Sequence, residues 1–447
     1  MRSDICIIGS GFSAAAMLLH LDDKGVDCGT ITVIGHGELG SGQAFGCVHR
    51  DFRLNVRAEL MRVWPEKPLE FTHWAKERIT DDPDAASDVG YFYRRRDFAV
   101  YMTEQLDRRA GTKSASRIEA EATALAREEG GWRITLDDGR MLSAGRVILA
   151  TGNPPPDWPF SGVVPEASSL VRVPWRGDWP AQLSGNERIV VIGSGLTALD
   201  TLHVLHRLDH GGMVTLVAPD GLLPPVQTDW RGADAVAWPE PMRASDFLTF
   251  MRRHIGDGDW RETEWQRRFE SLRVHICDAW QRLSPVDQAR LMRRAGWLWS
   301  LTRFRAGPQA HESAETLLTS GRLTIRRDMV SGIITGEGPQ HRVKLASGDS
   351  IDADFVVNCS GAGRDPLVSR LIDDGIAAPH AGFRGRPALT RDLALMHPNG
   401  TPYDTLFALG PVSAHEAGDV VGAPGTATQA DELARHLAAS TARDMAS

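Results

Sequence analysis

The sequence predicts an α/β protein with two nested Rossmann-type dinucleotide-binding domains and a helical insertion, and three observations support this fold class. A strand, a glycine turn, a helix and a second strand follow one another twice in the 447 residues. A hairpin that feeds a buried strand also occurs twice, with equal length in both copies. Between 228 and 318, strand-like runs give way to apolar residues at helical spacing.

The first unit consists of a buried parallel strand, a glycine turn, a helix and a second strand, which we expect at 5–8, 9–14, 15–21 and 31–34. In the turn, Gly9 permits a tight bend, Gly11 lets a pyrophosphate approach the backbone, and Ala14 packs the helix on the strand. The helix N-terminus offers unpaired N–H groups to phosphates. This stretch predicts a dinucleotide-binding site.

The second unit repeats this order at 189–192, 193–198, 199–208 and 214–217. One such glycine turn is a weak signal, but two in the same strand-turn-helix-strand context strongly favour two dinucleotide sites. The hairpin repeats run from Arg133 to Gly152 and from Arg342 to Gly361. We interpret them as the return strands of the two domains, whose small end residues let the chain pass close to a cofactor.

These patterns divide the chain into segments. We expect the first part of one dinucleotide-binding domain at 1–155, a second dinucleotide-binding domain at 156–227 and 319–350, a helical insertion at 228–318 and the second part of the first domain at 351–447. The insertion carries an apolar stripe from Trp265 to Leu283, which is typical of a helical core face.

The chain resembles flavoproteins that bind two dinucleotides, and more narrowly the bacterial FAD/NAD(P)-binding flavoproteins that are distantly related to flavin-containing monooxygenases. The resemblance rests on the two glycine turns, the loop Gly40–Gly46, the stretch Leu54-Asn55-Val56 with Met61, and Ala150-Thr151-Gly152. It implies FAD in the first domain and NADH or NADPH in the second. One departure is Glu166, which stands where the monooxygenase motif beginning at Phe160 has a histidine.

Candidate cofactor-binding residues follow from the turns and from this resemblance. They are Gly9, Gly11, Phe12, Ser13, Gly40, Gly42, Ala44, Asn55, Thr151, Gly152, Gly193, Gly195, Leu196, Thr197, Asp220, Gly361 and Gly410. An acid usually receives the ribose hydroxyls after the second strand of the first unit, but Gly35 stands there and Glu38 is the near alternative. Pro219 and Asp220 offer no cation to a 2′-phosphate, so we expect NADH to be favoured over NADPH.

Asn55 is the candidate catalytic residue. In the resembling monooxygenases an Asn in a similar stretch reaches the reactive edge of the flavin, where a neutral amide donates a hydrogen bond without supplying a proton. Arg94 or Arg95, and Arg303 or Arg305, are candidates for clamping an anionic substrate or a phosphate. Each of these residues has an ordinary structural alternative, in a loop or on the solvated surface.

Composition narrows the function further. The net charge of −8 and the absence of a basic stripe argue against nucleic-acid binding, and no apolar run reaches membrane-spanning length. The scattered cysteines contain no C-x-x-C pair and no metal-binding spacing, which indicates a cytoplasmic protein without a redox dithiol or a metal.

The predicted function is an FAD-dependent, NAD(P)H-using monooxygenase that acts with O₂ through a flavin C4a-peroxide on a small molecule. The alternatives are an FAD-dependent reductase that transfers no oxygen and a non-catalytic flavin-binding sensor. The sequence leaves the substrate and the oligomeric state open.

Overall fold

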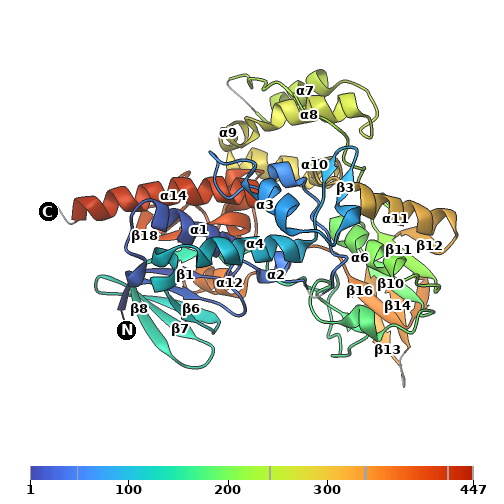
Figure 1. Cartoon of the computed structure of the whole chain (residues 1–447), viewed down its shortest axis with the longest axis horizontal. Coiled ribbons are helices and arrows are strands. Elements are labelled where there is room, and N and C mark those ends of the chain that lie inside the picture. Colours follow the sequence, from blue (N-terminus) through green and yellow to red (C-terminus); the bar gives the residue numbers. More distant parts are fainter. Residues whose placement is uncertain (1, 48, 241–242, 337–339, 420–421, 445–447) are drawn as a thin grey trace.

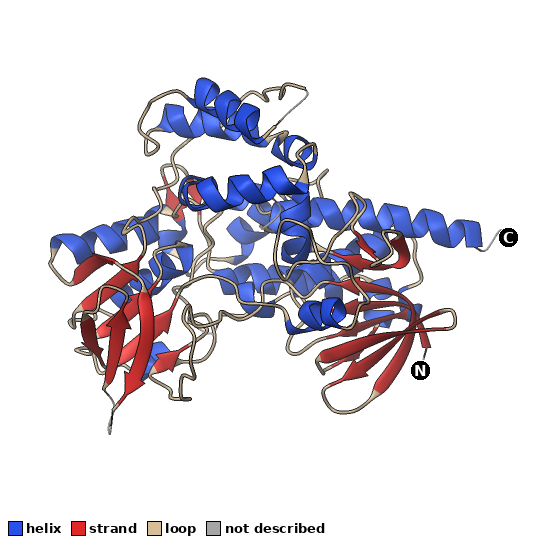
Figure 2. Ribbon diagram, turned by 180° about the vertical axis from the view of Figure 1, so that it is seen from behind, coloured by secondary structure: helices blue, strands red, loops and turns tan. Residues whose placement is uncertain are grey.

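The computed structural model describes residues 2–47, 49–240, 243–336, 340–419 and 422–444. Two mainly parallel sheets lie on opposite sides of the molecule, with helices between them and above them (Figure 2). The predicted α/β class with two Rossmann-type units is therefore confirmed.

The first unit is built around β1 (Arg2–Ile8), whose apolar residues are buried because the strand lies inside the sheet. β1 pairs in parallel with strands on both sides, and Ile5 lies opposite Ile31 and Arg146. The spatial order of the sheet is β17 (Ala394–Met396), β18 (Pro402–Ala408), β8 (Met141–Leu149), β1, β2 (Ile31–Ile34) and β5 (Ser116–Ile118). Helix α1 (Phe12–Asp23) packs along α14 (Ala423–Asp444), which runs out to the C-terminus (Figure 1).

The second unit repeats this arrangement around β10 (Ile189–Ile192). The order of its sheet is β12 (Leu323–Arg327), β11 (Val214–Ala218), β10, β16 (Phe355–Asn358) and β9 (Leu170–Val171). Helix α6 (Leu196–Arg207) covers the sheet beside α11 (Pro308–Thr319). The small residues Ala306, Ala310 and Ala314 are fully buried in this core, which allows the two helices to approach closely.

Both predicted hairpins are present, with one difference between the copies. In the first, β6 (Ala122–Glu128) and β7 (Gly131–Leu136) lead into β8, a single strand that also pairs with β1. In the second, β13 (Val330–Thr335), β14 (His341–Leu345) and β15 (Ser350–Ala353) form a separate sheet, and β16 begins after Asp354. At this break the Asp354 carboxylate accepts hydrogen bonds from the Arg188 backbone and guanidinium.

The helical insertion has a core of its own. Its helices are α7 (Ala244–Ile255), α8 (Thr263–Arg273), α9 (Ile276–Gln281) and α10 (Pro285–Arg303). The predicted apolar stripe is buried there, including Phe269, Leu272 and Trp280. Figure 1 shows α7, α8 and α9 above the body of the molecule.

Two segments lie elsewhere than the sequence analysis placed them. Helix α11 belongs to the core of the second unit and not to the insertion, because its alanines face α6. Residues 351–358 likewise join the second unit and not the first, because β16 pairs in parallel with β10. The chain returns to the first unit only after this strand.

The shorter elements connect these layers. They are α2 (Gly42–Phe45), α3 (Glu70–Arg78), β3 (Ala86–Ser87), β4 (Gly90–Tyr91), α4 (Arg95–Asp107), α5 (Ala110–Ser114), α12 (Pro366–Asp373) and α13 (Ala414–Ala417).

Candidate functional site: two glycine turns and the junction between them

The first glycine turn can be formed only by glycine at its first position. Gly9 has φ +127°, and a Cβ there would lie 2.2 Å from the Ala150 carbonyl oxygen at the end of β8. Backbone hydrogen bonds from Gly9 to Ile34 and from Ala150 to Ile8 fix this approach. Helix α1 then begins with Gly11 as its N-cap, no side chain caps it, and no acidic residue lies in its first turn. Its first amides are therefore available to an anion, as a pyrophosphate requires.

The predicted loop at Gly40–Gly46 lies directly against this turn. The Gly40 amide donates to the Ser10 carbonyl at 2.8 Å. Gly42 has φ +50°, and a Cβ there would come within 2.7 Å of the Gly11 Cα. Ala44 follows in α2, and its carbonyl accepts from Arg95 Nη1 at 3.3 Å. The loop thus joins the first turn to α4, which leads toward the second unit.

The position after β2 cannot supply the acid that usually holds the ribose. A Cβ on Gly35 would lie 2.7 Å from the Ser10 backbone nitrogen, so any side chain there would displace the glycine turn. Glu38 is exposed, and its backbone carbonyl accepts from Ser41 Oγ at 2.6 Å. The pyrophosphate part of an FAD seat is therefore present, whereas ribose recognition must differ from the usual pattern.

The end of β8 and the C-terminal segment close the first seat from the other side. Gly410 has φ +79°, and a Cβ there would lie 2.6 Å from Ser13 Oγ at the start of α1. The Thr151 hydroxyl donates to Asp365 Oδ2 at 2.5 Å, so it is already engaged by the protein. A cavity of about 130 Å³ beside Gly152 is lined by Arg364, Arg384 and Arg386 among others. The sequence analysis missed these arginines because they lie in loops that are far from Gly152 along the chain.

The second glycine turn has the same geometry as the first. Gly193 has φ +99°, and a Cβ there would lie 2.4 Å from the Cys359 carbonyl at the end of β16. Gly195 is the N-cap of α6, again without a side-chain cap, and a Cβ on it would meet no atom within 4 Å. Leu196 and Thr197 are partly exposed at the start of α6, and Gly361 has φ +109° just beyond β16. The turn is closed against the sheet and open toward a ligand.

Asp220 lies next to the second turn. Its Oδ1 accepts from the Leu222 amide at 3.2 Å, as expected for a turn residue, and lies 3.5 Å from Ser194 Oγ within the glycine turn. The carboxylate therefore lies against the second glycine turn. The start of the Arg327 side chain is also near, because a Cβ on Gly221 would lie 3.0 Å from the Cβ of Arg327 at the end of β12.

Asn55 lies in a buried polar cluster that joins the two units. Its side chain lies near Asp200 on α6 and acts to lower the pKa of that carboxyl group. Asp200 is 1% exposed and forms a 2.8 Å ion pair with Arg95 Nη2 on α4. The Arg95 guanidinium lies 5.2 Å from the Trp175 ring. Burial raises the pKa of Asp200, while Arg95 and Asn55 act to lower it. The sequence signal for Asp200 was a lone carboxylate on the apolar helix just after the glycine turn.

The predicted arginine clamps have different environments. Arg94 Nη1 pairs with Asp81 at 2.8 Å, Arg95 pairs with Asp200, and Arg303 Nε contacts Asp419 at 2.8 Å. Arg305 Nη1 donates to Glu270 at 2.6 Å, but the rest of its guanidinium is not used in this way. All four arginines are therefore held by ion pairs within the protein, and Arg305 differs in having two buried nitrogens without a partner among the described residues.

The cysteines are not arranged for thiol chemistry. All five are free, and burial raises the pKa of Cys6, Cys28, Cys47 and Cys359 to about 12, which keeps their thiols protonated. Within the described ranges, no group of His, Cys, Asp or Glu side chains could hold a metal ion. In the same part of the chain, no helix combines the length and apolar character needed to cross a bilayer.

Comparisons with known proteins agree with the presence of two dinucleotide-binding turns. Residues 6–154 match the FAD-NAD(P)-binding family model, a range that ends just after the return strand of the first unit. The bifunctional protein MnmC of tRNA 5-methylaminomethyl-2-thiouridine biosynthesis from Idiomarina loihiensis is 26% identical over 220 residues. That alignment covers 39% of this chain and 35% of the relative, so the chain spans only about a third of the length of the curated relative.

Solved structures resemble the chain over nearly its whole length. The ornithine N-hydroxylase of Kutzneria sp. 744, solved with reduced FAD, NADP⁺ and L-ornithine, has a TM-score of 0.68 at 16% identity and covers 99% of this chain and 100% of its own. The cadaverine monooxygenase DfoA of Erwinia amylovora, solved with FAD, has a TM-score of 0.67 at 13% identity, with coverages of 98% and 94%. The bacillithiol disulfide reductase of Bacillus cereus has a TM-score of 0.56 at 15% identity, with coverages of 98% and 100%.

These findings define the class of protein. The fold is that of flavoproteins with two dinucleotide-binding units, and the first unit carries the FAD/NAD(P)-binding family domain. The chain accordingly has the fold of these two-dinucleotide flavoproteins, and its first unit matches a model for FAD and NAD(P) binding.

Proposed function

We propose that the protein is an FAD-dependent monooxygenase that uses NADH or NADPH and O₂ to oxygenate a small molecule. The observation that carries the proposal is the position of Asn55, at the junction of the units and in contact with α6 of the second unit. The whole-length similarity to an ornithine N-hydroxylase and a cadaverine monooxygenase supports it.

FAD, when bound, would supply hydride acceptance and the activation of O₂, and the protein residues would bind and orient the reactants. The Asn55 side chain lies near the Asp200 carboxylate, which the Arg95 guanidinium holds in place. The neutral amide of Asn55 can donate a hydrogen bond to this carboxylate and accept one from an N–H of the nicotinamide or the substrate. The side chain is neutral, so it positions these groups without releasing a proton.

A reductase that passes electrons to an acceptor other than O₂ is the second candidate. The similarity to a bacillithiol disulfide reductase and the Glu166 departure favour it. A disulfide-exchange route through the protein's own thiols is disfavoured, because the buried cysteines have raised pKa values and none is paired with another. Such a reductase would need an external acceptor.

Nicotinamide preference is a separate part of the proposal. Asp220 beside the glycine turn supports NADH, because a carboxylate accepts from ribose hydroxyls and repels a 2′-phosphate. An Arg327 guanidinium turned toward this turn would oppose the preference, since the Arg327 Cβ lies beside Gly221. We retain NADH as the favoured donor, with kinetics on both cofactors as the test.

The replacement Asn55→Ala tests the oxygenase role. FAD content should stay unchanged, while oxygenated product per NAD(P)H falls and hydrogen peroxide rises to replace it. Loss of one aimed polar group commonly costs about 3 kcal/mol, or roughly a hundredfold in rate. The conservative control Asn55→Gln should restore part of the coupling. If Asn55→Ala forms as much oxygenated product per NAD(P)H as wild type, over a panel of small amines and thioethers, Asn55 has only a structural role in its loop.

A further inference from the structure

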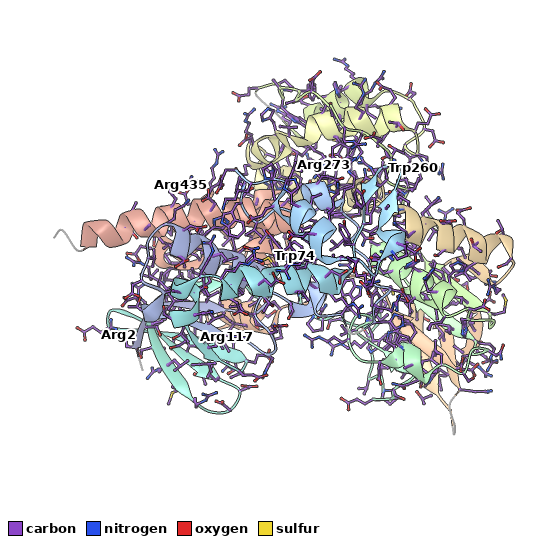
Figure 3. All side chains as sticks on the ribbon, viewed as in Figure 1. Arg2, Trp74, Arg117, Trp260, Arg273 and Arg435 are labelled. Carbon is purple, nitrogen blue, oxygen red and sulfur yellow. The ribbon has the colours of Figure 1, made fainter. Side chains whose placement is uncertain are left out.

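A buried cluster of charges beneath the helical insertion contains more cations than anions. Glu270 on α8 accepts from Arg305 Nη1 at 2.6 Å and also from Arg273. Asp419 accepts from Arg273 Nη2 at 2.6 Å and from Arg303 Nε at 2.8 Å. Figure 3 labels Arg273 where the insertion meets the body of the molecule. Three guanidiniums therefore share two carboxylates, whose side chains are only 7% and 5% exposed.

Arg305 is the member of this cluster with unused hydrogen-bond donors. Its side chain is 2% exposed, and Nη1 makes its one ion pair, with Glu270. Nε and Nη2 are buried without a partner among the described residues. These two nitrogens form one edge of the guanidinium, the edge that binds a carboxylate through two parallel hydrogen bonds. Leaving a buried charged donor unpaired is costly, so the arrangement favours an anion at this edge.

More unused donors lie in the same region. Arg57 is 3% exposed, and its Nη1 lies 3.6 Å from Asp229 Oδ1 and donates to the Val89 carbonyl at 3.3 Å. Its Nε has no partner among the described residues, and its guanidinium lies 4.5 Å from the Trp230 ring, whose Nε1 is also unpartnered there. The charge of Glu270 acts on both Arg57 and Arg305, which places them in one electrostatic environment. The Glu59 carboxylate also acts on Arg57 and offsets part of this positive charge, and its Oε2 is buried without a partner among the described residues.

The cluster adjoins the stretch that carries Asn55. Arg57 is two residues beyond Asn55, and a Cβ on Gly307, two residues beyond Arg305, would lie 3.6 Å from the Leu54 carbonyl oxygen. The chain on each side therefore brings unused guanidinium donors to the segment that we propose to be catalytic.

We infer that the Nε and Nη2 edge of Arg305, with help from Arg57, binds a carboxylate of the substrate, so that the substrate is a small organic acid or amino acid. The inference names the substrate class of the proposed oxygenase and therefore rests on Asn55 marking that site. The geometry distinguishes Arg305 from Arg303, whose Nε is bonded to Asp419.

Stability measurements on the FAD-loaded protein test this inference without turnover. Thermal unfolding is followed for wild type, Arg305→Met, Arg305→Lys and the control Arg303→Met, in chloride and in sodium malonate at equal ionic strength. Malonate should raise the Tm of wild type, and its affinity should be at least tenfold weaker in Arg305→Met and Arg305→Lys. In chloride, Arg305→Met should be as stable as wild type or more so, because two guanidiniums then balance two carboxylates. Arg303→Met should be destabilised but should keep the malonate response.

Three results would overturn the inference. Arg305→Met could lose as much stability as Arg303→Met while wild type ignores malonate, which would make Arg305 a structural ion pair. An equal malonate response in wild type and Arg305→Met would place the anion elsewhere. Saturation by inorganic phosphate at lower concentration than malonate would refute the carboxylate assignment. Malonate binding through Arg305 without oxygenated product would instead contradict the proposed function and leave the anion site intact.

Discussion

Replacing each of the two glycines of the second turn by alanine should have different effects on the stability of the protein. In Gly193→Ala the added Cβ would lie 2.4 Å from the Cys359 carbonyl oxygen, on a backbone with φ +99°. The backbone strain alone costs about 1–3 kcal/mol, and relieving the contact requires a shift of β16. We expect a loss of at least about 3 kcal/mol, or about a hundredfold in the folding equilibrium. In Gly195→Ala the Cβ meets no atom within 4 Å, so the stability should change by less than about 1 kcal/mol.

Urea unfolding and anaerobic flavin reduction separate these effects. Gly195→Ala should fold like wild type and keep its FAD, but its kcat/KM for NAD(P)H should fall about tenfold or more, because the methyl group occupies the path of the pyrophosphate. Gly193→Ala should be visibly less stable even without nicotinamide. Wild-type reduction kinetics in Gly195→Ala would mean that the nicotinamide cofactor does not cross this turn, and wild-type stability in Gly193→Ala would refute the geometric argument.

The remaining predictions concern FAD, pH and cofactor preference. Gly11→Trp should abolish FAD binding because the tryptophan side chain fills the path of the pyrophosphate. Gly11→Ala should fold normally, since its Cβ would lie at an ordinary contact distance of 3.6 Å from the Gly42 Cα. The flavin content of the two purified variants tests this prediction. Burial acts to raise the pKa of Glu187, but hydrogen bonds from Ser184 and Gly185 lower it from 4.5 to about 2. The contribution of Glu187 to stability is therefore present above pH 4.5 and is lost as the pH falls toward 2. In urea unfolding at a series of pH values, Glu187→Gln should lose less stability than wild type over this range. Asp220→Ser should shift the ratio of kcat/KM values toward NADPH by about tenfold, or 1.4 kcal/mol, and an unchanged ratio would show that Asp220 is only a turn residue.

The turns and return strands could be predicted from the sequence because local pattern determines them. A glycine between a buried strand and a helix, with a second strand ending in small residues, leaves few other arrangements. The structure adds the reason for the pairing, since Gly9 meets Ala150 just as Gly193 meets Cys359.

Partners across long sequence separations could not be predicted in this way. Helical spacing identified residues up to 318 as helical but did not reveal that the α11 alanines pack on α6. Arg303 and Arg305 were equal candidates for an anion clamp, and only the positions of Asp419 and Glu270 distinguish them. The link from Asn55 to Asp200 joins two units and leaves no local pattern in either segment.

The central claim is that FAD in the first unit receives electrons from a nicotinamide cofactor in the second. Anaerobic mixing of the purified, FAD-loaded protein with NADH or NADPH tests it most directly. We expect one FAD per chain and a loss of visible flavin absorbance that saturates with nicotinamide concentration. When O₂ is then admitted, a carboxylate-bearing substrate should be converted to an oxygenated product. A protein that binds no FAD, or whose flavin absorbance is unchanged by both cofactors, would contradict it.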